Sequence, residues 1–196
     1  MQLIPTILEK EFEKTLERVE MIDQTNRWTQ IDVVDGEFVE GKSFELELLK
    51  NIENKLWDIH LMVKEPIKWI EKCMYVGASR VIGQVEKMSD RKAFINKLKN
   101  EGVEAGLGID IESEIGEIPE ETDIILLMGR KAGFGSFELD QRIWKKIELV
   151  KKMKQKVAVD GGVNMENIDK IKSYGVDIVY CGKDYFNLFE KYGKNY

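Results

Sequence analysis

Short apolar runs alternate along the chain with longer charged segments. The intervening segments carry apolar residues three to four positions apart, with Lys and Glu elsewhere, as in residues 90–102 and 140–155. This is the pattern of helices that cover a sheet. Gly77, Gly102 and Gly175 each fall between such a pattern and the next apolar run, which predicts helix ends there. Eight runs rich in Ile, Val and Leu predict buried strands at residues 3–8, 29–35, 57–63, 80–86, 104–110, 123–129, 156–162 and 177–182.

This alternation predicts an α/β protein, a single (β/α)8 barrel of the TIM type. The 196 residues are enough for about one domain, and no linker rich in Gly, Pro or Ser divides residues 1–196. A doubly wound parallel sheet is the alternative. The dinucleotide fingerprint GxGxxG is missing after the first predicted strand, which argues against an NAD enzyme of that kind. We therefore expect eight βα units in one barrel domain.

Polar residues interrupt three of the predicted strands. Because side chains alternate along a strand, Gln30 and Asp32 point into the barrel together, as do Asp58 and His60, and Asp160 does so from the seventh strand. Barrel interiors are normally filled by branched aliphatic side chains, and an unpaired buried carboxylate is costly. A metal ion, a bound substrate or shared protonation would each compensate for the two carboxylates at positions 32 and 160, and the pattern alone leaves all three open.

Glycines gather at the ends of three consecutive predicted strands. The sequences KAGFGSF, DGGVN and CGKD occupy residues 131–137, 160–164 and 181–184. Glycine allows backbone N–H groups to approach an anion closely, and the helix N-termini that follow add a positive dipole. Because (β/α)8 enzymes often hold phosphate after strands seven and eight, we expect an anion site here.

Charge and composition exclude several classes of function. The chain has 36 acidic and 30 basic residues, so it lacks the basic field that attracts nucleic acid. No apolar run reaches the length of a membrane span, and the N-terminus becomes charged too early for a signal peptide. We expect a soluble cytoplasmic protein without nucleic-acid or membrane partners. Cys73 and Cys181 form no metal-binding or disulfide pattern.

Six motifs resemble those of ribulose-phosphate 3-epimerases. IPTIL, QIDVVDGEFVEG, WDIHLMVKEPIKWI, EAGLGID, MGRKAGFGSF and VAVDGGVNMENI occur in the order and at the spacings of that family, from Leu3 to about Phe186. The resemblance implies a (β/α)8 enzyme with a divalent metal cofactor (Mn, Mg, Zn or Fe). It also implies a ketose-phosphate substrate, with ribulose 5-phosphate and xylulose 5-phosphate as the leading pair, and it suggests a homo-oligomer.

Position by position, the resemblance implies a catalytic set, a metal set and a substrate set. Asp32 and Asp160 resemble the two acid/base carboxylates that work on opposite faces of the inverted carbon. The implied metal ligands are His60, Asp32, Asp160 and Gln30. The implied substrate-binding residues are Thr6, Met128, Gly135, Gly161, Gly162, Gly182 and Lys183, of which the four glycines would hold the phosphate.

Several residues depart from the family pattern. Gln30 and Gln84 stand where the family usually has histidine, and an amide oxygen suits a hard cation better than zinc or iron. The phosphate loop lacks its usual proline and carries Arg130 and Lys131, and Lys183 stands where a small hydroxyl residue is common. These cations strengthen anion binding, mark a different substrate or are ordinary surface residues. A degenerate barrel that binds a phosphorylated ligand or scaffolds a partner without turnover is the alternative function.

Overall fold

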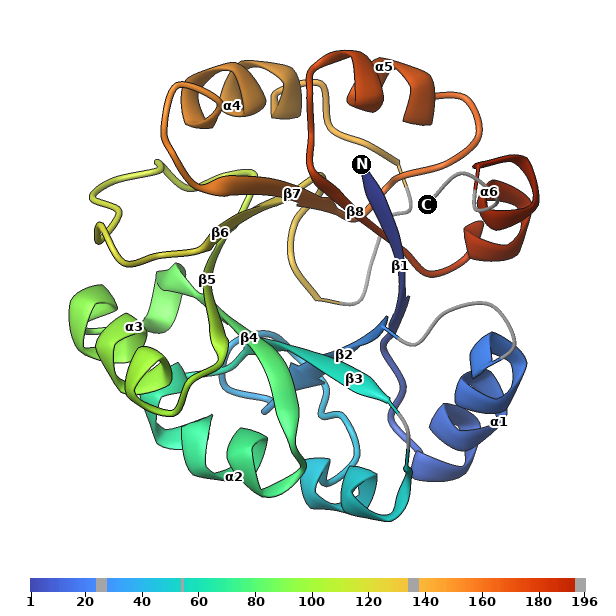
Figure 1. The fold of residues 1–196 in the computed structure, drawn as a ribbon, viewed down its shortest axis with the longest axis vertical. Helices are drawn as coiled ribbons and strands as arrows, with labels where there is room; N and C mark the ends of the chain where they lie inside the picture. The colour runs from blue at the N-terminus through green and yellow to red at the C-terminus, as the bar shows by residue number, and fades with distance from the viewer. Residues whose placement is uncertain (24–27, 54, 134–137, 193–196) are drawn as a thin grey trace.

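Eight parallel strands close into a barrel in chain order (Figure 1). The computed structural model describes residues 1–23, 28–53, 55–133 and 138–192. The last strand pairs with the first, with Ile178 opposite Gln2. All eight predicted strands are present, which confirms the (β/α)8 TIM-barrel prediction. The strands are β1 (Gln2–Ile7), β2 (Trp28–Val34), β3 (Leu56–Met62), β4 (Ala78–Gln84), β5 (Glu104–Ile109), β6 (Ile124–Met128), β7 (Lys156–Asp160) and β8 (Ile178–Cys181).

Helices surround the barrel as an outer layer (Figure 1). Gly77, Gly102 and Gly175 adopt positive φ angles of 75°, 76° and 73°, which confirms that they end helices. In the described part of the chain, no helix is long and apolar enough to cross a bilayer. The α-helices are α1 (Phe12–Asp23), α2 (Ile70–Tyr75), α3 (Arg91–Asn100), α4 (Ile143–Val150), α5 (Ile168–Ser173) and α6 (Tyr185–Tyr192), and the 3₁₀ helices are η1 (Leu46–Asn51), η2 (Pro66–Trp69) and η3 (Val85–Lys87).

The connection between β5 and β6 has no helix, although the sequence pattern predicts eight βα units. Residues 110–123 are all described and run as turns and irregular chain. This segment is acidic and contains neither Lys nor Arg. Gly116, with φ of 64°, and Pro119 interrupt it, so repulsion between acidic side chains and these two residues oppose a helix. Arg91 fastens the segment through Nη1, which donates to the carbonyl of Ile115 at 2.7 Å.

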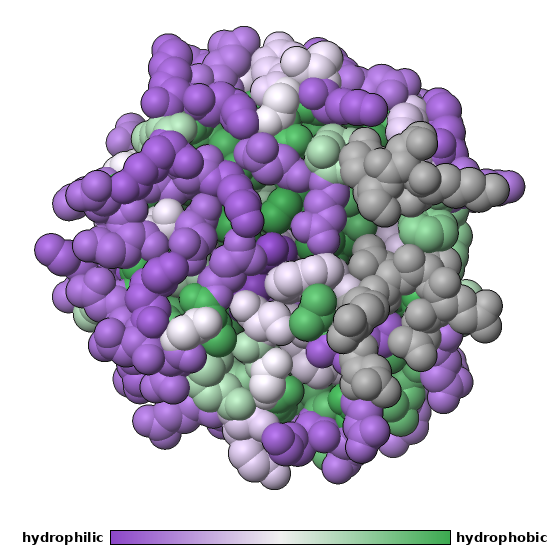
Figure 2. All heavy atoms as spheres, viewed as in Figure 1, coloured by the Kyte–Doolittle hydropathy of each residue, from purple (hydrophilic) through white to green (hydrophobic). Residues whose placement is uncertain are grey.

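The core lies on both sides of the barrel wall. Between the strands and the helices, the larger apolar cluster includes Ile31, Ile59 and Ile147. Inside the barrel, a smaller cluster includes Val34 and Met62. Side chains two residues apart share one face of a strand, so the polar residues at positions 32 and 60 face the interior with these two apolar residues. On the outside, hydrophilic side chains cover most of the face in Figure 2, with smaller hydrophobic patches between them.

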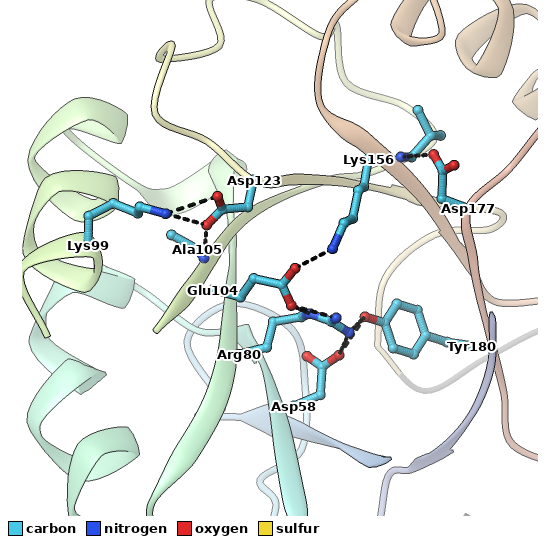
Figure 3. Close-up of polar contacts among 10 residues, drawn as sticks. Asp58, Arg80, Lys99, Glu104, Ala105, Asp123, Lys156, Asp177 and Tyr180 are labelled. Carbon is cyan, nitrogen blue, oxygen red and sulfur yellow. Dashed lines mark hydrogen bonds and ion pairs between the residues drawn. The ribbon is translucent and has the colours of Figure 1, made fainter. Parts of the chain in front are cut away.

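A buried network of charged groups occupies the barrel interior near the N-terminal ends of the strands (Figure 3). Arg80 donates through Nη1 to Asp58 Oδ2 at 2.7 Å and to the Tyr180 hydroxyl at 3.1 Å. Its Nε and Nη2 donate to Glu104 Oε2 at 2.9 and 2.6 Å. Tyr180 donates to the same Asp58 oxygen at 2.5 Å, and Lys156 donates to Glu104 Oε1 at 2.7 Å. Arg80 and Asp58 form the buried part of this network, and Glu104 and the exposed Lys156 extend it to the surface.

We expect Arg80→Met to destabilise the protein by about 3–5 kcal/mol, because it leaves a buried carboxylate without its cation. Urea unfolding followed by circular dichroism measures the free energy of unfolding. The exposed pair Lys42 and Glu45 provides a control, since its side chains are 60% and 62% exposed at a separation of 3.0 Å. Lys42→Met should leave the unfolding midpoint nearly unchanged. Equal losses in both variants would contradict the view that burial sets the cost.

Candidate active site

Strands β2, β3 and β7 bring Asp32, His60 and Asp160 together inside the barrel. The three side chains are buried, and the strand register places residue 32 directly opposite residue 60. His60 Nδ1 lies 2.9 Å from Asp32 Oδ1 and 3.8 Å from Asp160 Oδ2. The convergence of polar groups that alternation predicts for these three strands is therefore present.

Asp32 is fixed through both of its carboxylate oxygens. Its Oδ1 faces the imidazole, and its Oδ2 accepts a hydrogen bond of 3.0 Å from the Thr6 hydroxyl on β1. Two partners on neighbouring strands leave this carboxylate little rotational freedom. Thr6 thus lies beside the carboxylate cluster, at the position where the resemblance puts a contact to substrate hydroxyls.

The pKa values of two groups in the cluster are raised above their ordinary values. Burial and the negative charge of Asp32 raise the pKa of Asp160 to about 7, although the His60 imidazole and Arg130 oppose the rise. Burial lowers the pKa of His60, but the hydrogen bond to Asp32 and the nearby carboxylates outweigh burial and raise it overall. A carboxyl group that gains and loses a proton near pH 7 is suited to general acid/base chemistry.

The same three residues fit a divalent metal ion. Within the described residues, they are the one group of at least three His, Cys, Asp or Glu donors whose ligand atoms all lie within 4.8 Å of one another. Two carboxylates and one imidazole leave positions for further ligands, as in catalytic rather than structural sites. A single donor set thus combines acid/base groups with a candidate metal site.

Two buried glutamines add unpartnered amides to the interior. Both side-chain atoms of Gln30 and of Gln84 lack hydrogen-bond partners among the described residues, as does His60 Nε2. Gly108 leaves room beside them, since a Cβ there would meet Gln84 Oε1 and lie 3.3 Å from His60 Nε2. Buried amides without partners are costly, so these groups favour a polar or cationic guest. The role of Gln30 as an oxygen ligand, which the resemblance implies, stays a prediction.

A cavity of about 670 Å³ lies over the two carboxylates. Its wall includes both aspartates of the cluster. Gln30 and His60 are fully buried and lie behind this wall. Gly135 falls outside the described residues. The remaining predicted substrate-binding residues all line the cavity: Thr6, Met128, Gly161, Gly162, Gly182 and Lys183.

The backbone conformation of the turn after β7 requires glycine at two positions. Gly161 and Gly162 have φ angles of 90° and 74°, a region that favours glycine. A Cβ on Gly162 would lie 2.6 Å from the backbone nitrogen of Leu139. The turn therefore brings backbone, without side chains, to the edge of the cavity, which is the arrangement of an anion-binding loop.

Sequence reasoning missed several residues that line the cavity, namely Arg18, Asn164 and Asp184. Arg18 projects from α1 and pairs with Glu9 at 2.9 Å. Residues of this kind follow no periodic pattern, because their place in the site depends on how a helix or loop packs against the barrel. Lys131, which the sequence placed beside the site with its neighbour at position 130, is not among the residues that line the cavity.

These features define a (β/α)8 barrel whose candidate site lies at the carboxyl ends of the strands, where barrel enzymes carry their chemistry. Residues 2–186 match the model of the ribulose-phosphate 3 epimerase family, and the chain belongs to this family.

Its relatives include ribulose-phosphate 3-epimerases from three bacteria. The Treponema pallidum protein is 24% identical, with 94% of this chain and 91% of that protein covered. The Bacillus subtilis protein is 26% identical, with 93% and 90% covered. The Aquifex aeolicus protein is 27% identical, with 79% and 75% covered.

Solved structures share the fold. A mutant tryptophan synthase α-subunit from Pyrococcus furiosus superposes with a TM-score of 0.68 at 16% identity, with 99% of this chain and 92% of that chain covered. Phosphoribosyl anthranilate isomerase from Thermococcus kodakaraensis gives a TM-score of 0.67 at 16% identity, with 100% and 99% covered. At these identities the likeness shows the barrel fold alone.

We expect Mn²⁺ to bind more tightly as the pH rises from about 6 to about 8. At the acidic end Asp160 and His60 hold protons, because the pKa of the carboxyl group is about 7 and that of the imidazole is raised. Metal ligands must be deprotonated, so each displaced proton changes the affinity by up to ~10-fold per pH unit. Calorimetry in buffers of different ionisation enthalpy measures both affinity and proton release. A pH-independent affinity without proton release would contradict this expectation.

Proposed function

We propose that the protein is a sugar-phosphate epimerase that interconverts ribulose 5-phosphate and xylulose 5-phosphate by proton transfer at the carbon next to the carbonyl. The observation that carries the proposal is the pair of buried carboxylates, Asp32 and Asp160, whose oxygens lie 2.9 and 3.8 Å from His60 Nδ1 at the wall of a ligand-sized cavity. Membership of the ribulose-phosphate 3 epimerase family supports the substrate class.

The reaction needs a base on one face of the substrate carbon and an acid on the other. Asp32, held by Thr6 and His60, presents an oriented carboxylate. Asp160, with a pKa of about 7, is suited to deliver a proton in the same turnover. A divalent cation bound by these two carboxylates, the imidazole and Gln30 would stabilise the negative charge of the enediolate. The two aspartates exchange roles when the reaction runs in reverse.

The phosphate end of the substrate would lie against the glycine turns. Gly161, Gly162 and Gly182 line the same cavity as the two carboxylates. Backbone N–H groups at such turns bind an anion without adding side chains that compete for space. The cavity of about 670 Å³ is large enough for a pentulose phosphate. A cytoplasmic location and a homo-oligomer stay predictions.

A barrel that binds a phosphorylated ligand without turnover is the second candidate. The observation that favours it is the pair Gln30 and Gln84, whose buried amides lack partners at positions where the family usually has histidine. Retention of both aspartates at the cavity favours catalysis instead, because a binding protein has no need of two desolvated carboxylates.

Solvent hydrogen exchange distinguishes the two candidates. In deuterated water with Mn²⁺ or Mg²⁺, ribulose 5-phosphate should gain deuterium at the carbon next to the carbonyl as xylulose 5-phosphate forms. Asp32→Asn or Asp160→Asn removes one proton-transfer group at nearly constant shape and should slow exchange by about 10²–10⁴-fold. Proton NMR of the substrate measures the exchange.

The matched control is Asp169→Asn on α5, where the aspartate side chain is 69% exposed. This variant should exchange at the wild-type rate. If wild-type protein gives no exchange above background with pentulose or hexulose phosphates, with Mn²⁺, Mg²⁺ or Zn²⁺ present, the epimerase proposal fails. Ligand-induced thermal protection in that case would support the binding protein.

The metal preference depends on Gln30. Amide and carboxylate oxygens suit Mn²⁺ or Mg²⁺, whereas imidazole favours zinc. We therefore expect Gln30→His to tighten Zn²⁺ binding relative to Mn²⁺, as measured by competition calorimetry. Tight stoichiometric zinc in the wild-type protein, with no gain in the variant, would show that Gln30 does not set the preference.

A further inference from the structure

Arg130 begins the loop after β6 at a point where two loops are in close contact. The preceding residue, Gly129, donates its backbone N–H to the carbonyl of Asp160 at 2.6 Å. A Cβ on Gly129 would collide with the carbonyl oxygen of Gly161, so only glycine permits this approach. The contact fixes the start of the β6 loop directly against the turn after β7.

The side chain of Arg130 therefore lies over the glycine turn. A Cβ built on Gly161 would be 2.9 Å from Arg130 Cγ and 3.3 Å from its Nε, so the glycine leaves the space that the arginine fills. One end of the guanidinium is anchored, because Nη1 donates to the carbonyl of Gly133 at 2.8 Å. Among the described residues, Nε and Nη2 of Arg130 take part in no hydrogen bond, and the residue lines the cavity.

The charges that line the cavity explain why the positive charge of Arg130 matters for phosphate binding. Three carboxylates line the cavity, those of Asp32, Asp160 and Asp184, together with three cations, Arg18, Arg130 and Lys183. A phosphate dianion entering this space meets like charge, and backbone N–H groups carry only partial positive charge. A guanidinium supplies a full positive charge and a planar set of donors that match phosphate oxygens. The field of a cation at this point would offset the repulsion.

Two further cations line the cavity, Arg18 and Lys183, and Lys183 follows Gly182 on the loop after β8 and not the Gly161 turn. Arg18 is paired with the Glu9 carboxylate at 2.9 Å. Lys131 does not line the cavity, is 71% exposed and pairs with Glu112 at 3.1 Å. Among the described carboxylates, none forms an ion pair with Arg130 within 4.0 Å. Of the two adjacent cations that the sequence placed near the site, the structure thus brings only the first to the cavity.

We infer that Arg130 is a phosphate-binding, specificity-determining residue of this site, with Nε and Nη2 directed at a phosphate held over the Gly161 turn. The inference rests on the proposed sugar-phosphate function and sharpens its ligand class. The site selects ligands with a dianionic phosphate and discriminates against the same sugars without phosphate. Gly161 and Arg130 act as a pair, in which the missing side chain of one makes room for the other.

The test compares Arg130→Met, Arg130→Lys and the matched control Lys131→Met. Calorimetry measures the dissociation constant of inorganic phosphate, and thermal unfolding and Mn²⁺ affinity report on the fold and the carboxylate cluster. We expect Arg130→Met to weaken phosphate binding by about 10- to 100-fold, as for loss of a hydrogen bond to a charged group. Arg130→Lys should recover most of the affinity, and Lys131→Met should bind phosphate as the wild type does.

The outcomes separate a binding role from a structural one. Unchanged unfolding and Mn²⁺ affinity in Arg130→Met, with weakened phosphate binding and rescue by lysine, supports the inference. Equal phosphate affinity in Arg130→Met and Lys131→Met overturns it. So does absence of phosphate binding in the wild type, or a loss that lysine does not rescue and that lowers stability in parallel. Arginine-dependent phosphate binding without hydrogen exchange in any ketose phosphate would instead refute the epimerase proposal and leave this inference standing.

Discussion

Desolvation of the carboxylates inside a closed barrel is the constraint on which the site depends. The parallel strands turn every second side chain inward, and this places Asp32 and Asp160 beside one imidazole, away from bulk water. Their mutual repulsion and burial raise the proton affinity of Asp160 to the neutral range. The same desolvation makes the cluster attractive to a cation. Acid/base capacity and metal affinity are thus two results of a single arrangement.

The barrel interior is polar at two levels, for different reasons. Toward the N-terminal ends of the strands, Arg80 is paired with Asp58 and with Glu104, and Glu104 also pairs with Lys156, so the charges there pair with one another (Figure 3). Toward the carboxyl ends, the described side chains leave amides and an imidazole nitrogen without partners. Paired charges stabilise the barrel, whereas polar groups without partners beside the cavity favour a ligand. This contrast indicates that the chemistry takes place at the carboxyl ends of the strands.

Much of the fold and of the candidate site could be predicted from sequence, because both depend on short-range periodicity. Alternation along 29–35 and 57–63 was sufficient to place Asp32 and His60 in the interior, and Gly102 marked a helix end through its conformational freedom. The absence of a helix in segment 110–123 was missed because the regular βα alternation of the rest of the chain outweighed the local signals of Gly116, Pro119 and the acidic side chains.

Other features depend on tertiary packing and have no local signal. Arg130 and Lys131 are chemically similar neighbours, yet only the first lines the cavity, because Gly129 packs against the turn after β7. Arg18 enters the cavity wall from a helix whose sequence shows only a charged surface. Such features are visible only in the folded structure, because the contacts that produce them join residues far apart in the chain.

Tyr180 belongs to the last strand, and this has a consequence for how the protein folds. Its hydroxyl is hydrogen-bonded to both Asp58 and Arg80, which lie on strands much earlier in the chain. Until β8 docks between β7 and β1, those buried charges lack one partner, and an incomplete barrel is energetically penalised. Contacts between distant parts of a chain form late, because the entropy of closing a long loop must first be overcome. Docking of β8 therefore joins closure of the barrel to the pairing of its interior charges.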